Sequence, residues 1–169
     1  MLEVLVATAS RHGATREIGD QLGAQISAGL KDRGIDATVD VRDVEDVDDL
    51  AVYDALVLGS AVYMGRWLKS ARKLVDREAE TLQAIPVWLF SSGPVATDDK
   101  AIPESPWERV EWAEDHHTFG GKLDRSTLGR AERFVASMVH AADGDNRSPA
   151  EIAEWAQHIS TSLAASASG

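Results

Sequence analysis

Short apolar runs alternate with amphipathic segments along this chain of 169 residues. The clearest runs are 2–7, 37–41, 55–60 and 87–91, and the segments between them carry apolar residues at helical spacing. Strands that alternate with helices predict a parallel sheet with helices on both faces. Mostly apolar runs such as 2–7 and 55–60 fit this prediction, because the strands of a parallel sheet are buried on both faces.

Residues 14–33 are expected to form the first helix, because Ile18, Leu22, Ile26 and Leu30 recur at intervals of four. Gly34 follows as a C-terminal cap. Further elements are expected at 67–83, 107–114, 124–142 and 149–163 as helices and at 117–123 as a weaker fifth strand. We therefore expect one α/β domain over 1–165, doubly wound around a five-stranded parallel sheet, with a frayed tail over 166–169.

Composition excludes several classes of protein. The chain contains no cysteine, which excludes disulfides and thiolate metal sites and fits a reducing compartment. The formal net charge of −11 argues against a nucleic-acid partner. It indicates either an ordinary solvated acidic surface or a surface that docks a basic partner. No apolar run approaches the ~20 residues of a membrane span, and the N-terminus lacks a signal-peptide pattern, so we expect a cytoplasmic protein.

The stretch "TASRHGATREIG", residues 8–19, stands between the first strand and the first helix. Thr8, Ser10 and Thr15 carry hydroxyls, and Gly13 permits a left-handed backbone or a close approach to a ligand. The N–H groups at a helix start carry the positive end of its dipole, so this loop fits a phosphate. The alternative is an ordinary turn in which Ser10 or Thr15 caps the helix.

Other phosphate and nucleophile motifs are absent from the sequence. There is no G-x-x-x-x-G-K-[S/T], which argues against a P-loop NTPase. No G-x-G-x-x-G follows the first strand, which argues against the usual dinucleotide site, and no G-x-S-x-G is present. The pair His116-His117 predicts no metal site, because neighbouring residues on a strand point to opposite faces.

The stretch "VLVATASRHGATREIGDQL" resembles the flavodoxin signature of an apolar strand, a hydroxyl and glycine loop, and a helix. Positions that fall on the family pattern are Ser10, Gly13, Thr15 and Leu22. Thr8 stands where an aromatic residue is usual, and Gly19 stands where alanine is usual. The stretches "VLGSAVYMGRWLKSARKLV" and "WLFSSGPV" are similar to the two flavodoxin loops that line the flavin ring, so the resemblance covers nearly the whole chain.

Within that family the chain is most similar to the branch of menaquinone-dependent protoporphyrinogen dehydrogenases. The similarity lies in "FGGKLD", in the "GDNR…I…WA" ending and in an extra helical segment, here 124–142. The resemblance implies noncovalently bound FMN. The phosphate would be held by Thr8, Ser10, Arg11, His12, Gly13, Ala14 and Thr15. The ring would be framed by Ser60, Ala61, Val62, Tyr63, Met64, Gly65, Ser91, Ser92, Gly93 and Pro94.

Some of these residues keep a second interpretation. Tyr63 is either a ring-packing residue or a surface residue at a helix start, and Ser91–Gly93 is either a ring-binding loop or a plain turn. Trp67 is expected to pack between helix and sheet, while Phe119 is either a core residue or an edge of the ligand site.

The resemblance implies an FMN-dependent oxidoreductase, with quinone-linked protoporphyrinogen oxidation in heme biosynthesis as the leading function. The alternatives are an acidic flavodoxin-type electron carrier and a flavin-free binding or regulatory domain of the same fold. The implied partners are a quinone, a porphyrinogen or an electron-transfer protein, and helix 124–142 leaves peripheral membrane contact open. We assign no catalytic residue, because the flavin itself accepts hydride or electrons.

Overall fold

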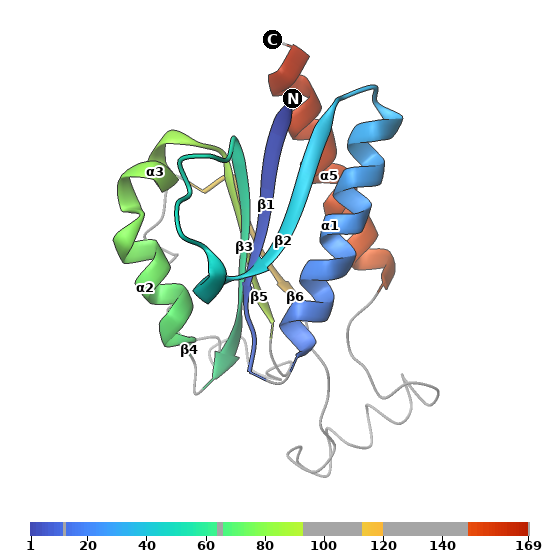
Figure 1. Ribbon diagram of the computed structural model, residues 1–169. Helices are drawn as coiled ribbons and strands as arrows, with labels where there is room; N and C mark the ends of the chain where they lie inside the picture. The colour runs from blue at the N-terminus through green and yellow to red at the C-terminus, as the bar shows by residue number, and fades with distance from the viewer. Residues whose placement is uncertain (12, 64–65, 93–112, 120–148, 169) are drawn as a thin grey trace, which may run out of the picture.

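The computed structural model describes residues 1–11, 13–63, 66–92, 113–119 and 149–168 (Figure 1). Its strands are β1 (Leu2–Ala9), β2 (Ala37–Asp43), β3 (Ala55–Tyr63), β4 (Arg66–Trp67), β5 (Val87–Ser92) and β6 (Asp115–Phe119). Its helices are α1 (Ala14–Asp32), α2 (Lys69–Arg77), α3 (Ala79–Ala84) and α5 (Pro149–Ser168), with a short 3-10 helix η1 (Val44–Asp46) after β2.

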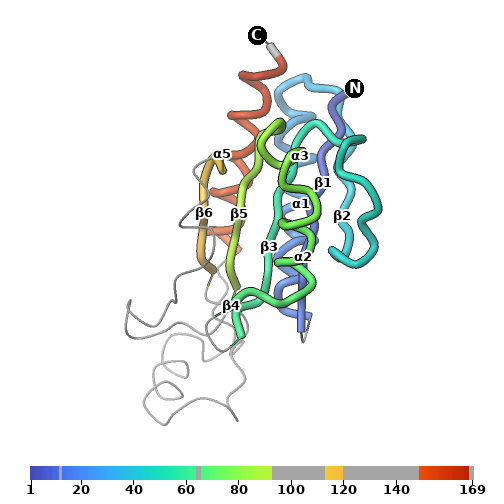
Figure 2. Tube along the Cα trace, turned by 90° about the vertical axis from the view of Figure 1, so that its left-hand side faces the viewer, coloured from blue at the N-terminus to red at the C-terminus, as the bar shows by residue number. Residues whose placement is uncertain are grey.

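The strand order is β2-β1-β3-β5-β6, and every neighbouring pair in this order is parallel. The short strand β4 pairs with β3 antiparallel and lies off this path. Helices α1 and α5 cover one face of the sheet, and α2 and α3 cover the other (Figures 1 and 2). The predicted doubly wound α/β fold with five parallel strands is therefore confirmed.

The alternation of side chains along each strand divides the interior into two apolar layers. In β1, Val4 and Val6 pack with Ile18 and Leu22 of α1, while Leu5 packs on the opposite face. The layer under α1 and α5 also holds an aromatic cluster of Phe90, Phe119 and Trp155, whose rings meet edge to face at 5.7–6.0 Å between centroids. Burial on both faces explains why the central strands are mostly apolar.

Helix α1 ends as its sequence predicts. Gly34 takes a left-handed φ of 73°, and the N–H of Ile35 donates to the carbonyl of Leu30 at 2.9 Å. The N–H of Gly34 donates to Lys31 at 3.0 Å, which completes the hydrogen-bond pattern of a glycine C-cap. This turn leads the chain directly into β2.

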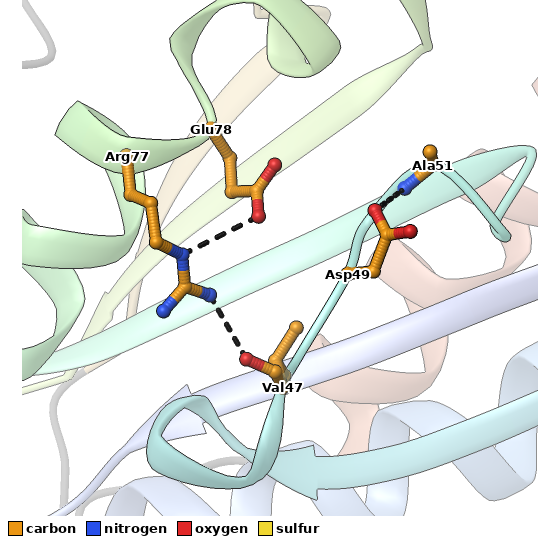
Figure 3. A network of polar contacts seen from close by, with 5 residues as sticks. All are labelled: Val47, Asp49, Ala51, Arg77 and Glu78. Atoms are coloured by element: carbon orange, nitrogen blue, oxygen red, sulfur yellow. Dashed lines mark hydrogen bonds and ion pairs between the residues drawn. The ribbon is translucent and has the colours of Figure 1, made fainter.

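The helix expected over 67–83 is divided in the structure. Trp67 belongs to β4, and Glu78 separates α2 from α3 with φ −107° and ψ 22°. Arg77 donates to the carboxylate of Glu78 at 3.3 Å and to the carbonyl of Val47, in the loop after η1, at 2.9 Å (Figure 3). In the same loop the N–H of Ala51 donates to Asp49 at 2.8 Å. Of these three bonds only the one from Arg77 to Val47 joins residues far apart in the sequence, and helical periodicity alone does not predict it.

Three further boundaries differ from the expected ones. The fifth parallel strand begins at Asp115, and its expected end over 120–123 lies outside the described residues. Helix α5 continues past the expected end at Leu163 to Ser168, so the tail over 166–168 is helical. Of the helix expected over 107–114, only 113–114 are described, and they are not helical. The extra helix expected over 124–142 lies outside the described residues.

Candidate functional site

The carboxyl ends of the parallel strands meet at the lower edge of the sheet in Figure 1. The register places Ala9 of β1 beside Ser60 of β3 and Ser60 beside Ser91 of β5. Ser91 in turn lies beside Thr118 of β6, so hydroxyl residues occupy one level on three neighbouring strands. The direction of winding reverses between β1 and β3, and such a switch point is where doubly wound sheets bind their ligands.

The loop from β1 to α1 is shaped by Ser10 and Gly13. The N–H of Gly13 donates to the Ser10 hydroxyl at 2.8 Å, and the Gly13 carbonyl accepts the first helical hydrogen bond, from Glu17, at 3.0 Å. Gly13 has φ 89° and ψ −12°, in the left-handed region that favours glycine. No atom lies within 4 Å of the place where a Cβ would stand on Gly13, so the backbone is open there.

Helix α1 begins without a side-chain cap from Gly13, its N-cap residue. Two hydroxyl residues beside this start, Thr8 and Thr15, are each only 1% exposed. Neither hydroxyl makes a hydrogen bond to another described residue. Buried hydroxyls are nearly always paired, so these two, which have no partner among the described residues, mark a place suited to an outside acceptor such as an anion.

Thr8 and Gly19, the two departures from the flavodoxin pattern, face each other. A Cβ on Gly19 would stand 2.6 Å from the Cγ2 methyl of Thr8, which is closer than any real contact of this kind. The absence of a side chain at Gly19 therefore makes room for the branched side chain of Thr8. The two departures therefore compensate each other sterically.

The end of β3 turns into β4 through a bond network centred on Ser60. The Ser60 hydroxyl donates to the carbonyl of Ala61 at 2.8 Å and accepts from the N–H of Leu68 at 3.0 Å. The strands of this turn pair Val62 with Trp67 in antiparallel register. The Ser60 side chain therefore stabilises the turn, and its hydroxyl proton is donated to a protein carbonyl.

Arg11 and Tyr63 connect the loop after β1 to the end of β3. The guanidinium carbon of Arg11 lies 3.7 Å from the centroid of the Tyr63 ring, a close cation–π contact. Tyr63 remains 50% exposed, and Arg11 is exposed. Sequence reasoning placed both residues near a flavin but missed their contact, because nothing in local periodicity pairs residues on different loops.

Ser91, at the end of β5, is held by side chains of β4 and β6. The indole N–H of Trp67 donates to the Ser91 hydroxyl at 2.9 Å, and His116 Nε2 lies 2.9 Å from the same oxygen. Trp67 is 2% exposed, as expected for a residue that packs between helix and sheet. Ser92 is also buried, and Phe119 is wholly buried, so Phe119 is a core residue.

The adjacent histidines of β6 have separate surroundings. His117 Nε2 lies 2.5 Å from the carboxylate of Glu151 in α5, and its ring packs against Phe119 and Trp155. His116 instead contacts Ser91, toward the α2 face of the sheet. Among the described residues no group of three or more histidine and acidic side chains is arranged to hold a metal ion.

Several predicted cofactor residues lie outside the described residues, namely His12, Met64, Gly65, Gly93 and Pro94. Trp107 and Trp112 lie outside them as well. The structure brings the remaining predicted residues together at the carboxyl edge of β1, β3 and β5. In the part of the chain that is described, no helix combines the length and apolar character needed to cross a membrane.

A strand–loop–helix site at the switch point of this sheet defines a class of nucleotide-binding α/β proteins. A family model described as "Flavodoxin domain" matches residues 5–149 of the chain. The chain therefore belongs to the flavodoxin domain family, and this membership indicates FMN as the cofactor. Flavodoxin is itself a standard example of ligand binding at the β1/β3 switch point.

Solved structures support the same fold. An oxidoreductase from Corynebacterium diphtheriae superposes with a TM-score of 0.65 at 14% identity, covering 95% of this chain and 96% of the other. A flavodoxin from the domain Archaea superposes with a TM-score of 0.57 at 16% identity, covering 96% and 99%. The flavodoxin of Streptococcus pneumoniae TIGR4 gives 0.56 at 20% identity, covering 97% and 99%. A comparison with curated protein sequences found no significant match.

Proposed function

We propose that this protein binds FMN noncovalently and passes electrons between redox partners through the bound flavin. The observation that carries the proposal is the loop between β1 and α1. It joins a left-handed Gly13, a helix start without a side-chain cap, and a buried Thr15 hydroxyl without a partner among the described residues. Such a group of uncharged donors fits the terminal phosphate of FMN.

The fit can be stated residue by residue. Gly13 holds the loop open, so that a phosphate can approach the N–H groups at the start of α1. The Ser10 hydroxyl accepts from Gly13 and still has its own proton to donate. Thr15 supplies a second hydroxyl from inside the helix start. We propose that Thr8, His12 and Ala14 make further contacts with the phosphate, and that Arg11 belongs to the same cofactor site.

The flavin ring would lie against the ends of β3 and β5. Tyr63 offers a half-exposed aromatic face, and Ser92 ends β5 at the same edge of the sheet. We propose that the ring is framed by Ser60, Ala61, Val62, Tyr63, Met64, Gly65, Ser91, Ser92, Gly93 and Pro94. When bound, FMN supplies the redox chemistry, while these residues position the ring and exclude water from it.

We propose two more specific functions for the FMN-binding protein. One is quinone-linked oxidation of protoporphyrinogen in heme biosynthesis, in the cytoplasm or at a membrane surface. Of the residues that carry this resemblance, 120–124 of "FGGKLD", the segment 124–142 and "GDNR" lie outside the described residues. The other is an electron carrier, which the net charge of −11 favours through docking to a basic partner. Turnover of protoporphyrinogen with a menaquinone analogue supports the first, and salt-sensitive electron transfer to a basic protein supports the second.

Both functions require FMN binding. Titration of FMN with the purified protein, monitored by the quenching of flavin fluorescence, tests that binding. Wild type is expected to bind, and Thr15→Val is expected to weaken binding about ten- to a hundredfold, the value of a hydrogen bond to a charged group. The same variant should not lower the stability of the flavin-free protein, because the hydroxyl it removes has no partner among the described residues.

Ser160→Ala is the matched control. Ser160 is wholly buried in α5, and its hydroxyl donates to the carbonyl of Ala156 at 2.8 Å, away from the strand ends. Loss of this hydroxyl should lower the free energy of unfolding by about 1 kcal/mol and leave the affinity for FMN unchanged. Failure of the wild-type protein to bind FMN would refute the proposed function and favour a flavin-free domain.

A further inference from the structure

Arg11 and Tyr63 form the only cation–π pair among the described residues, and we call it the Arg11–Tyr63 clasp. It spans the switch point of the sheet, since Arg11 follows β1 and Tyr63 ends β3. The register places Ala9 and Ser60 side by side, so the two loops leave the sheet as neighbours. The clasp therefore joins the loop proposed for the phosphate to the loop proposed for the flavin ring.

The side chain of Arg11 is directed to the aromatic ring. Its guanidinium carbon lies 3.7 Å from the ring centroid, which is the separation of stacked groups in contact. The phosphate loop meanwhile has uncharged groups of its own, from Ser10, Gly13 and Thr15. An arginine that contacts Tyr63 limits the rotation of a ring that is otherwise half in solvent.

We propose that Arg11 is a positioning residue for the flavin ring, acting through Tyr63, and that it is not a ligand of the phosphate. The proposal rests on the proposed function, because it concerns the same FMN site. By holding Tyr63 in one orientation, Arg11 reduces the ordering cost of packing a flat ring against that side chain. The consequence is a contribution to affinity that does not depend on the phosphate group.

Comparison of FMN with riboflavin separates the two roles, because riboflavin has the same ring and no phosphate. Arg11→Gln is expected to weaken both flavins by the same factor, about two- to fivefold, which is the range for an exposed cation–π pair. Arg11→Lys keeps a cation within reach of the ring and should recover part of the loss. Fluorescence titration of both flavins, at one salt concentration, measures these factors.

A double-mutant cycle shows whether Arg11 acts through the ring. Tyr63→Leu removes the aromatic face, and on this background Arg11→Gln should have no further effect on either flavin. Arg16→Gln is the charge control, since Arg16 is also exposed and lies in the first turn of α1. It removes the same charge and should leave riboflavin affinity unchanged.

The results that overturn the inference are distinct from those that overturn the proposed function. Weakened FMN with unchanged riboflavin in Arg11→Gln would make Arg11 a phosphate ligand. An undiminished effect of Arg11→Gln in the Tyr63→Leu background would show that Arg11 does not act through the ring. Wild-type protein that binds neither flavin would overturn both the proposed function and this inference.

Discussion

Replacement of Gly13 by alanine is the sharpest test of the proposed phosphate site, because a matched control residue, Gly34, lies after the other end of helix α1. Gly13, before the helix, has φ 89°, and Gly34, after it, has φ 73°. At both positions the space where a Cβ would stand has no atom within 4 Å. Gly13→Ala and Gly34→Ala therefore impose the same kind of backbone strain at opposite ends of one helix.

The expected cost to folding follows from this geometry. A non-glycine residue in the left-handed region costs about 1–2 kcal/mol, and no steric clash adds to it at either position. Both variants should therefore lose about 1–2 kcal/mol in the free energy of unfolding without flavin. Urea unfolding followed by far-UV circular dichroism measures this loss as a shift of the midpoint with an unchanged slope.

The expected cost to binding differs between the two ends. Strain at Gly13 is relieved by a shift of the loop, which moves the Ser10 hydroxyl and the N–H groups that would face the phosphate. Loss of one hydrogen bond to a charged group corresponds to about ten- to a hundredfold in FMN affinity. Gly34 precedes β2, whose first residue Ala37 pairs with Leu2 at the amino end of β1, so Gly34→Ala should bind FMN as wild type does.

The outcome that would refute this reasoning is equal FMN affinity in Gly13→Ala and Gly34→Ala, with both close to wild type. Such a result would remove the loop between β1 and α1 as the phosphate site. Equal stability of wild type and Gly13→Ala would contradict the left-handed conformation of the loop itself.

Two further predictions concern stability. Gly19→Ala should destabilise the protein by about 1–3 kcal/mol through its clash with the Thr8 methyl, and Thr8→Ser should restore most of that loss; a double variant no better than Gly19→Ala would contradict the contact. Burial and then the hydrogen bond to Asp40 raise the pKa of Tyr53 above its usual 10.0, so its contribution to stability is present below about pH 10 and is lost as the pH rises through the folded pKa. Urea midpoints between pH 8 and 11 should therefore fall more steeply for wild type than for Tyr53→Phe, and parallel curves would refute the shift.

The sequence by itself determined the layered fold. Apolar runs such as 2–7 and 55–60 encode strands buried on both faces, and the spacing of Ile18 and Leu22 encodes the buried face of α1. Gly34 marked the end of that helix because a left-handed cap is a local property of the backbone. The hydroxyl and glycine loop before α1 also pointed to an anion site, since helix starts bind anions through local N–H groups.

Only the tertiary structure decided how the side chains of that edge are used. Ser60 and Ser91 were expected beside a ligand, yet their hydroxyls bind Leu68, Trp67 and His116, which arrive from other strands and turns. Arg77, beside the division at Glu78, likewise donates to a distant carbonyl, that of Val47.

The physical reason for this difference is the sequence separation of the interacting residues. Burial and helix caps depend on residues a few positions apart, which a sequence displays directly. Hydrogen bonds such as Trp67–Ser91 and contacts such as Arg11–Tyr63 depend on strand order and register, which bring distant residues to one edge of the sheet. A periodic pattern carries no information on those pairings until the sheet is assembled.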